Sequence, residues 1–226
     1  MGPQRWRIWI RESGIDSYPE LTYEGHDVTL SVNIFKDLTR VMIPYQKEKI
    51  ENAICFFANE HQKKTKHPLY QTFLYKYLAF LDFETLRETG RPCLGLSYKA
   101  MERGPVPMEI YGKRHELKSP CYEFREDLEK RVTIHPKSKP NLDFFSKKEI
   151  KQMERLIEIY AESYIPTQMI SDASHQSISA WKKTWKKCPN GMIDYSAAFD
   201  DNLSRKKEAD LTFPEESYLI YRALEN

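Results

Sequence analysis

The segment of residues 76–111 constrains the fold of this 226-residue chain more than any other. Its sequence is KYLAFLDFETLRETGRPCLGLSYKAMERGPVPMEIY. The first part has the apolar spacing of a buried helix, which we predict over residues 68–89. Gly90 suits the left-handed position that ends a helix, and Pro92 bars its continuation. We then expect a short strand within residues 93–101, a proline-directed corner at residues 104–107 and a new helix that starts near Pro107.

Charge and apolar pattern restrict the class of protein. The 35 basic and 33 acidic residues leave a net charge of +2, which gives no general attraction to nucleic acid or to a membrane surface. The N-terminus lacks the continuous apolar core of a signal peptide, and no run of residues is long and apolar enough to span a bilayer. The four cysteines contain no C-x-x-C pair, which favours reduced thiols. We therefore expect a cytoplasmic protein without a membrane segment.

The remaining pattern predicts a mainly α-helical fold of the α+β type. Helices are expected over residues 45–63, after the capping box Ser146-Lys147-Lys148-Glu149, over residues 169–174 behind a Thr167 cap, and over residues 178–187. Residues 122–124 and 131–135 favour a small β-hairpin. This gives a short β-rich extension over residues 1–42, a helical domain over residues 43–199 and a C-terminal tail over residues 200–226.

Candidate catalytic and metal-binding groups are weak. Ser171, Asp172 and His175 have the residue types of a catalytic triad, but neighbours on one short helix cannot all converge on a substrate. His61 and His67 lack the spacing and the third ligand of a metal site. We therefore expect no catalytic residue, no metal, no cofactor and no enzymatic activity.

Two features have both a structural and a functional interpretation. Asp82 lies on an apolar helix about two turns after Lys76, so it must accept hydrogen bonds from the backbone or from a tyrosine hydroxyl, or else contact a partner. The sequence Gly104-Pro105-Val106-Pro107 lacks the free amides of a phosphate-binding loop. It therefore forms either a rigid corner or a preorganised ledge for a partner.

The alternatives to protein binding remain as hypotheses. Lysines 182, 183, 186 and 187 flank Trp185, a pattern that also occurs in nucleic-acid-binding proteins, although a solvated helix face explains it better at a net charge of +2. Nucleic acid is thus an unfavoured partner. An enzyme built around Asp82, Tyr98 and His175 is the third hypothesis.

Four blocks together resemble the Panacea domain, the SocA-like family of antitoxin-associated proteins of bacteria and phages. The first is residues 76–83, similar to K-L-L-Y-F-x-D-F, with Ala79 where the family usually has an aromatic residue. The second is Gly90-Arg91-Pro92 with Gly95, Tyr98 and Ala100. The third is residues 104–107 with Ile110 and Tyr111. The fourth combines residues 171–175, Trp181 and Ile193-Asp194-Tyr195.

The resemblance implies a helical domain that neutralises a cognate toxin by direct binding, in a toxin–antitoxin system, a mobile element or a phage. It also implies an alternative role as an adaptor that delivers a toxin to a cytosolic protease. The motif residues that the resemblance marks as possible partner contacts are Lys76, Asp82, Tyr98, Gly104, Pro105, Val106, Pro107, Tyr111, His175, Trp181 and Asp194.

Overall fold

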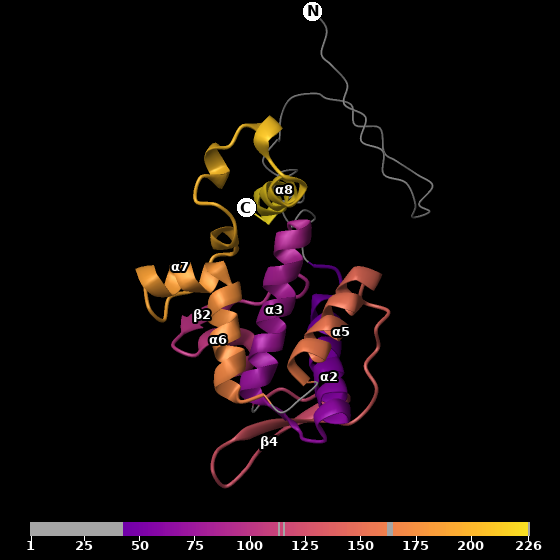
Figure 1. The fold of residues 1–226 in the computed structure, drawn as a ribbon. Helices are drawn as coiled ribbons and strands as arrows, with labels where there is room; N and C mark the ends of the chain where they lie inside the picture. The colour runs from indigo at the N-terminus through magenta and orange to yellow at the C-terminus, as the bar shows by residue number, and fades with distance from the viewer. Residues whose placement is uncertain (1–42, 113, 115, 162–164, 226) are drawn as a thin grey trace, which may run out of the picture. The chain divides into compact units, whose positions relative to one another are not determined.

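The computed structural model describes residues 43–112, 114, 116–161 and 165–225 (Figure 1). The expected β-rich extension of residues 1–42 lies outside this part of the chain. The longer helices are α2 (Gln46–Thr65), α3 (Gln71–Thr89), α5 (Lys147–Ala161), α6 (Thr167–Ser177), α7 (Ser179–Lys187) and α8 (Phe213–Glu225). Short helical turns are α4 (Met108–Tyr111), η1 (Tyr195–Ala198), η2 (Leu203–Arg205) and η3 (Glu208–Asp210). The strands are β1 (Leu69–Tyr70), β2 (Tyr98–Met101), β3 (Gly104–Pro107), β4 (Tyr122–Glu126) and β5 (Val132–Pro136). The predicted fold class, mainly α with small antiparallel sheets, is confirmed.

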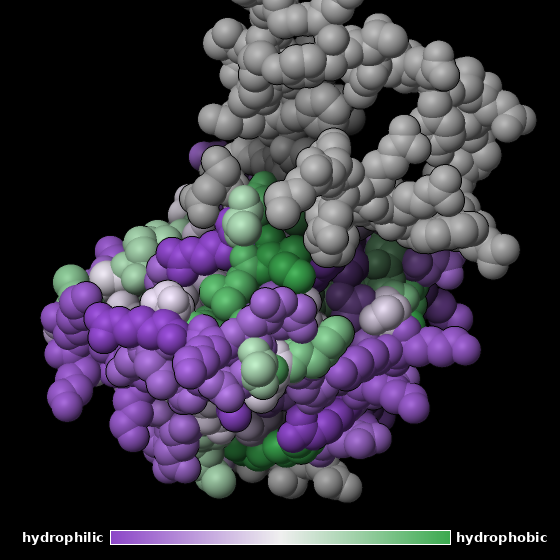
Figure 2. Space-filling view, turned by 90° about the horizontal axis from the view of Figure 1, so that it is seen from above, coloured by the Kyte–Doolittle hydropathy of each residue, from purple (hydrophilic) through white to green (hydrophobic). Residues whose placement is uncertain are grey.

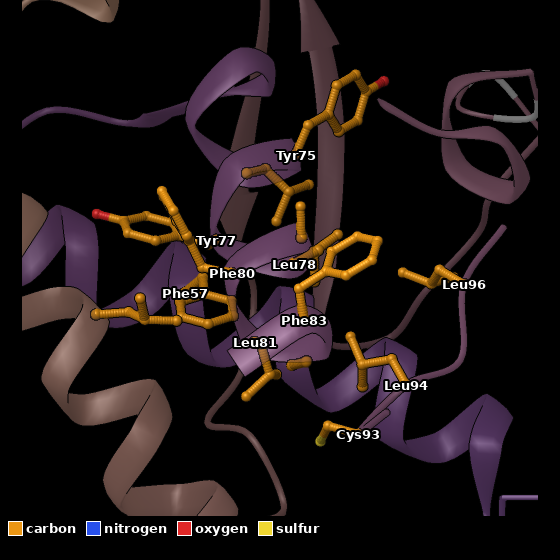
Figure 3. Packing of buried hydrophobic residues seen from close by; sticks show 14 of the residues in the cluster. Phe57, Tyr75, Tyr77, Leu78, Phe80, Leu81, Phe83, Cys93, Leu94 and Leu96 are labelled. Carbon is orange, nitrogen blue, oxygen red and sulfur yellow. The ribbon is translucent and has the colours of Figure 1, made fainter. Parts of the chain in front are cut away.

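Helix α3 is the centre of the fold. Figure 1 shows it between α5 and α2 on one side and α6 on the other, and it is buried on every face. Its aromatic side chains pack against those of neighbouring helices. Phe57 of α2 stacks on Tyr77 (Figure 3), and Tyr160 of α5 stacks on Phe80. A helix that is apolar all round needs such complete coverage, and the sequence run from Phe73 to Leu86 supplies it.

The two ends of α3 show one success and one error of the sequence pattern. Gly90 has φ +78° and donates its N–H to Leu86 O, so the predicted left-handed cap is confirmed. The start is wrong by three residues, because Leu69 and Tyr70 pair with β5 as strand β1 before the helix begins at Gln71. The spacing of apolar residues alone does not distinguish two strand residues from the first turn of a helix.

The capping box of α5 is confirmed. The Glu149 N–H donates to Ser146 Oγ at 3.3 Å, and the Ser146 N–H donates to Glu149 Oε2 at 2.7 Å. The cap predicted at Thr167 is wrong, because Thr167 is the first helical residue of α6 and Pro166 precedes it without a side-chain cap.

The Gly104–Pro107 segment is a strand, not a corner. It forms β3 and pairs antiparallel with β2, with Met101 opposite Gly104 and Tyr98 opposite Pro107. Of the residues 93–101 that were expected to form a strand, those from Tyr98 onward do so. Residues 190–193 run along the other edge of β2, where the Ala100 N–H donates to Gly191 O. The predicted hairpin of β4 and β5 is confirmed, and β1 extends it to a sheet of order β1-β5-β4.

The C-terminal segment packs against α3 through α8. A Cβ atom on Gly90 would lie within 3 Å of Pro214 O and of Ser217 Cβ, so the two helices meet closely at this point. Tyr218 and Tyr221 are buried, while Phe213, the first residue of α8, is 72% exposed. Figure 2, which looks onto the described residues from the α8 end, shows hydrophobic side chains gathered between hydrophilic ones.

Among the described helices, none is both long enough and apolar enough to cross a membrane.

Candidate functional site

The motif residues converge on the β2–β3 hairpin and the loop that precedes it. Lys76 and Asp82 lie six residues apart on α3, so they point in different directions from the same buried helix. Lys76 reaches the tip of the hairpin, and Asp82 reaches the loop of residues 93–97. Helices α6 and α7 complete the surroundings with Ser174, His175 and Trp181.

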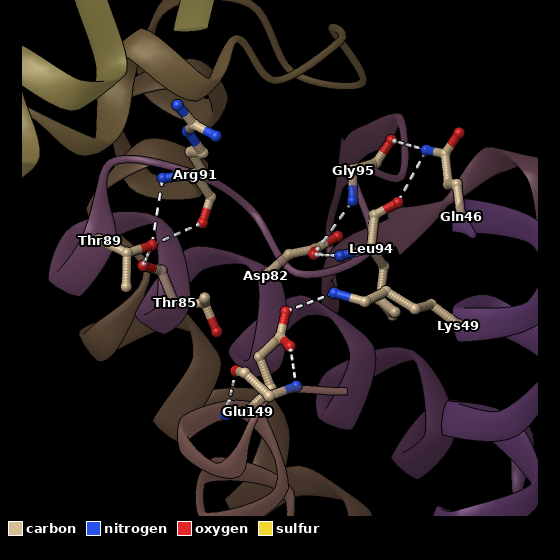
Figure 4. A network of polar contacts seen from close by, with 10 residues as sticks. Gln46, Lys49, Asp82, Thr85, Thr89, Arg91, Leu94, Gly95 and Glu149 are labelled. Atoms are coloured by element: carbon tan, nitrogen blue, oxygen red, sulfur yellow. Dashed lines mark hydrogen bonds and ion pairs between the residues drawn. The ribbon is translucent and has the colours of Figure 1, made fainter. Parts of the chain in front are cut away.

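Asp82 is fully buried and lies within hydrogen-bond distance of five donor groups. Its carboxylate accepts hydrogen bonds from the backbone N–H groups of Leu94 (2.5 Å), Gly95 (3.2 Å) and Leu96 (3.2 Å), as Figure 4 shows for the first two. It also accepts from the hydroxyl of Tyr98 (3.0 Å). The Tyr195 hydroxyl lies 3.2 Å from Asp82 Oδ2 and 2.7 Å from Leu96 O, so these two acceptors share its single proton. Burial raises the pKa of Asp82 to about 6, although these donors act in the opposite direction.

The saturation of Asp82 decides between its two interpretations. A carboxylate has about four lone-pair sites, and the three backbone N–H groups and the Tyr98 hydroxyl fill them. The predicted structural role, in which backbone and tyrosine donors satisfy the buried charge, is what the geometry shows. No acceptor capacity remains for a substrate proton.

Gln46 holds the same loop from the other side. Its side-chain amide donates to Leu94 O at 2.8 Å and to Gly95 O at 3.2 Å (Figure 4). The loop is therefore fixed through its N–H groups by α3 and through its carbonyls by the start of α2. Gly95, with φ +63°, supplies the left-handed conformation that directs both sets of groups.

Lys76 anchors the hairpin tip. Its side chain is 1% exposed, and its ammonium donates to the carbonyl oxygen of Arg103. Gly104 follows with φ +104°, and a Cβ atom there would lie 2.4 Å from Lys76 Nζ and 2.6 Å from Ser174 Oγ. Burial lowers the pKa of Lys76 to about 7. The glycine is thus required by its backbone conformation and by the lysine that passes over it.

His175 of α6 and Trp181 of α7 pack beside the β2–β3 hairpin. Their rings stack with centroids 3.9 Å apart, and Trp185 stacks on the other face of Trp181. The Trp181 Nε1–H donates to Met101 O at 3.0 Å. Burial, followed by the charge of Lys76, lowers the pKa of His175, whose Nε2 atom is buried without a partner among the described residues.

Asp194 belongs to the adjoining segment. Its side chain accepts a hydrogen bond from the Ser196 N–H at 2.8 Å and forms an ion pair with Arg222 of α8 at 3.3 Å. It therefore caps η1 and connects this turn to the C-terminal helix.

Most of the motif residues are inaccessible from outside. Those that are buried are Lys76, Asp82, Tyr98, Gly104, Pro105, Val106, Pro107 and Trp181. His175 is half-buried, and Tyr111 and Asp194 are exposed. The buried group positions a surface that consists of Tyr111, the hairpin tip Glu102 and Arg103, and Glu109. These exposed side chains therefore lie on a backbone that the buried motif residues fix in place.

Gln46, Ser174 and Tyr195 also belong to the site, although they were not among the predicted contact residues. Tyr195 stood in the fourth motif block, next to Asp194, which gave a signal for it. No sequence signal pointed to Gln46, because the carbonyl groups that accept its hydrogen bonds lie 48 and 49 residues away along the chain.

Residues of the triad and metal alternatives have other partners in the structure. The Ser174 hydroxyl donates to Ser171 O, Asp172 accepts from Gln168, and the His175 ring faces Trp181. His61 Nδ1 lies 3.0 Å from the Tyr77 hydroxyl in the core, and burial lowers its pKa to about 4. Among the described residues, no three histidine, cysteine or acidic side chains gather as a metal site would need.

Residues 74–182 match the family model described as "Antitoxin SocA-like, Panacea domain". The resemblance inferred from the four motif blocks is thereby confirmed. The match contains α3 from Leu74 onward, both hairpins, α5, α6 and the start of α7. No curated protein and no solved structure matches the chain.

Proposed function

We propose that this chain, which carries the SocA-like Panacea region over residues 74–182, is an antitoxin-type module that neutralises a cognate toxin by binding it directly. The match to the antitoxin family is the observation that carries the proposal. It implies an antitoxin-related role and a toxin as the partner.

The chemistry of the buried polar motif residues supports binding over catalysis. Asp82 is surrounded by donors, and Lys76 is bonded to a carbonyl beneath the hairpin. Such groups stabilise a particular backbone arrangement and do not present a reactive atom to a substrate. A preorganised surface loses less conformational entropy when a partner binds, which raises affinity.

The exposed side chains over this frame form the proposed contact surface. Tyr111 is 39% exposed, and tyrosine and arginine side chains dominate the binding energy of many interfaces. Arg114 lies over the Tyr111 ring at 5.5 Å, so a cation and an aromatic face are presented together. A typical interface of about 1,600 Å² extends well beyond these two residues.

Co-expression with the toxin encoded by the neighbouring gene tests the proposal. We expect cells to survive and the two proteins to co-purify in a fixed ratio. A fall in toxin level without co-purification would instead indicate delivery to a protease. A toxin that stays lethal beside folded, well-expressed protein rejects the proposal for that pair.

A matched pair of surface variants sharpens the test. Tyr111→Asp places a charge in the proposed contact surface and should weaken neutralisation. Ile159→Asp makes the same change at a 46% exposed position on α5 and should leave neutralisation intact. Equal behaviour of the two variants would exclude Tyr111 from the contact.

A further inference from the structure

On the outer edge of β4, the backbone groups of Tyr122 and Phe124 have no hydrogen-bond partner among the described residues. The strand order β1-β5-β4 leaves one side of β4 open. The Lys137 N–H donates to Cys121 O and the Asp127 N–H donates to Arg131 O, so odd-numbered residues of this strand face β5. Tyr122 and Phe124 therefore turn their N–H and C=O groups outward. In the described part of the chain, no hydrogen bond reaches these four groups.

In the β2–β3 hairpin, prolines on the outer edge of β3 prevent a further strand from pairing there. The Met108 N–H donates to Ser97 O, which places Gly104 and Val106 toward β2 and turns Pro105 and Pro107 outward. Proline has no N–H, so β3 offers an added strand no donor at these two positions. Strand β4 has donors at the equivalent positions. The two hairpins thus differ in whether a further strand can pair with them.

A groove runs beside the open edge of β4. It has a volume of about 390 Å³ and is lined by β4 together with Arg114, Leu117, Lys118 and Lys137. This volume is in the range of sites that hold small ligands or short peptide segments. An extended chain in this groove would have Tyr122 and Phe124 within reach of its own backbone.

The charge of the groove favours an acidic occupant. Four of its lining side chains are basic, namely those of Arg114, Lys118, Arg125 and Lys137, and two are acidic, those of Glu123 and Glu126. Arg125 pairs with Glu123 on the same strand. The Arg114 Nε atom is buried and has no partner among the described residues. Its Nη1 atom donates to Tyr111 O at a long 3.4 Å, so an incoming carboxylate would offer this guanidinium a charged and stronger acceptor.

We propose that the β4 edge binds an extended, acidic segment of a protein partner, which adds to the β1-β5-β4 sheet as a further strand. The inference rests on the proposed function, because it specifies where the toxin docks. Arg114 links the two surfaces, since it lines the groove and also covers the exposed Tyr111 ring. Backbone pairing with Tyr122 and Phe124 gives affinity, and the basic side chains select acidic segments.

A toxin-free peptide assay tests the inference on the full chain. The probe is a short fluorescent peptide that alternates glutamate and valine, and its counterpart alternates lysine and valine. Phe124→Pro and Phe124→Ala both remove the half-buried ring, but only proline removes the outward N–H. We expect Phe124→Pro to bind the acidic peptide about tenfold more weakly than Phe124→Ala, with the basic peptide weaker than the acidic one for every variant.

Further readouts keep the test decisive if either Phe124 variant fails to fold. Lys118→Glu reverses an exposed charge and should weaken binding of the acidic peptide. In the unmodified chain, the peptide should also slow hydrogen exchange of the Tyr122 and Phe124 amides. Equal affinity for both peptides, or unchanged exchange of these amides, would overturn the inference.

Different results would reject the antitoxin function and the binding site at the β4 edge. If Phe124→Pro neutralises the toxin as well as Phe124→Ala does, the β4 edge is not the docking site and the antitoxin function stands. If the acidic peptide binds as expected but no toxin is neutralised, the antitoxin function is rejected and the strand-addition site is retained for another partner.

Discussion

At the scale of single residues, Gly104 is the position where α3, the β2–β3 hairpin and α6 come closest. Lys76 reaches it from α3, and Ser174 reaches it from α6. Both neighbours are buried, and each is already committed to a backbone carbonyl, Lys76 to that of Arg103 and Ser174 to that of Ser171. Neither can move away without breaking that bond.

We predict that Gly104→Ala destabilises the protein by about 2 kcal/mol or more, because strain at a positive φ is added to the contact with Lys76. Urea unfolding of the purified variant measures this. Gly112→Ala is the matched control, since Gly112 has φ −73° and its Cβ would meet only Met108 O at 3.4 Å. If the two alanine variants are equally stable, Lys76 and Ser174 do not restrict the hairpin tip.

Lys76 gives the protein a pH dependence above neutrality. Its pKa is lowered by burial from 10.5 to about 7, so between these values the unfolded chain binds a proton that the folded chain does not. The free energy of unfolding therefore gains up to about 1.4 kcal/mol for each pH unit in this window and loses it again as the pH falls toward 7.

We predict that Lys76→Met removes this contribution. Stability of the unmodified protein relative to Lys76→Met should rise from pH 7 to pH 10.5, as measured by urea unfolding at a series of pH values. Lys182→Met, at an exposed lysine of α7, is the control and should follow the unmodified protein. A constant difference between Lys76→Met and the unmodified protein would show that Lys76 has an ordinary pKa.

At the scale of elements, the structure shows which signals in the sequence were sufficient. Gly90 and the Ser146–Glu149 capping box predict helix ends correctly, because each acts through neighbours in the chain. Asp82 could be predicted to need donors, since a carboxylate on an apolar helix has no other stable arrangement. Its donor Tyr195 lies 113 residues away, and no local pattern connects the two.

The hairpin of β2 and β3 shows why one element was missed. Two prolines in four residues favour a corner, since each removes a strand hydrogen bond. In the folded chain, Pro105 and Pro107 both point to the open edge, where no bond is lost. Which side of a strand a residue faces depends on the register with its partner, and a single sequence does not contain that information.

At the scale of the whole molecule, the C-terminal segment completes the cover of α3. Phe199 and Tyr218 pack with ring centroids 4.8 Å apart, and Tyr221 is buried beside them. Burial of one such aromatic side chain contributes about 1.5–3 kcal/mol, so α8 is a substantial part of the stability of the domain.

We predict that deletion of residues 200–226 lowers the unfolding temperature and exposes apolar surface at the end of α3. Thermal unfolding and binding of a hydrophobic dye measure the two effects. Ile220→Ser is the control, because Ile220 is on the outer face of α8 and is 50% exposed. A truncated protein that melts like the full chain would mean that α8 contributes no stability.

The contacts of Asp82 have a consequence for how such a domain is transferred between proteins. Residues 74–182 match the family, yet the carboxylate inside that segment binds Tyr195, and the loop beside it is held by Gln46. A gene fragment cut at the limits of the match would encode α3 without the cover that α8 provides. It would also leave the buried Asp82 without its contact to Tyr195. Recombination that preserves folding must therefore carry the flanks as well, at least from Ile43 to Tyr221.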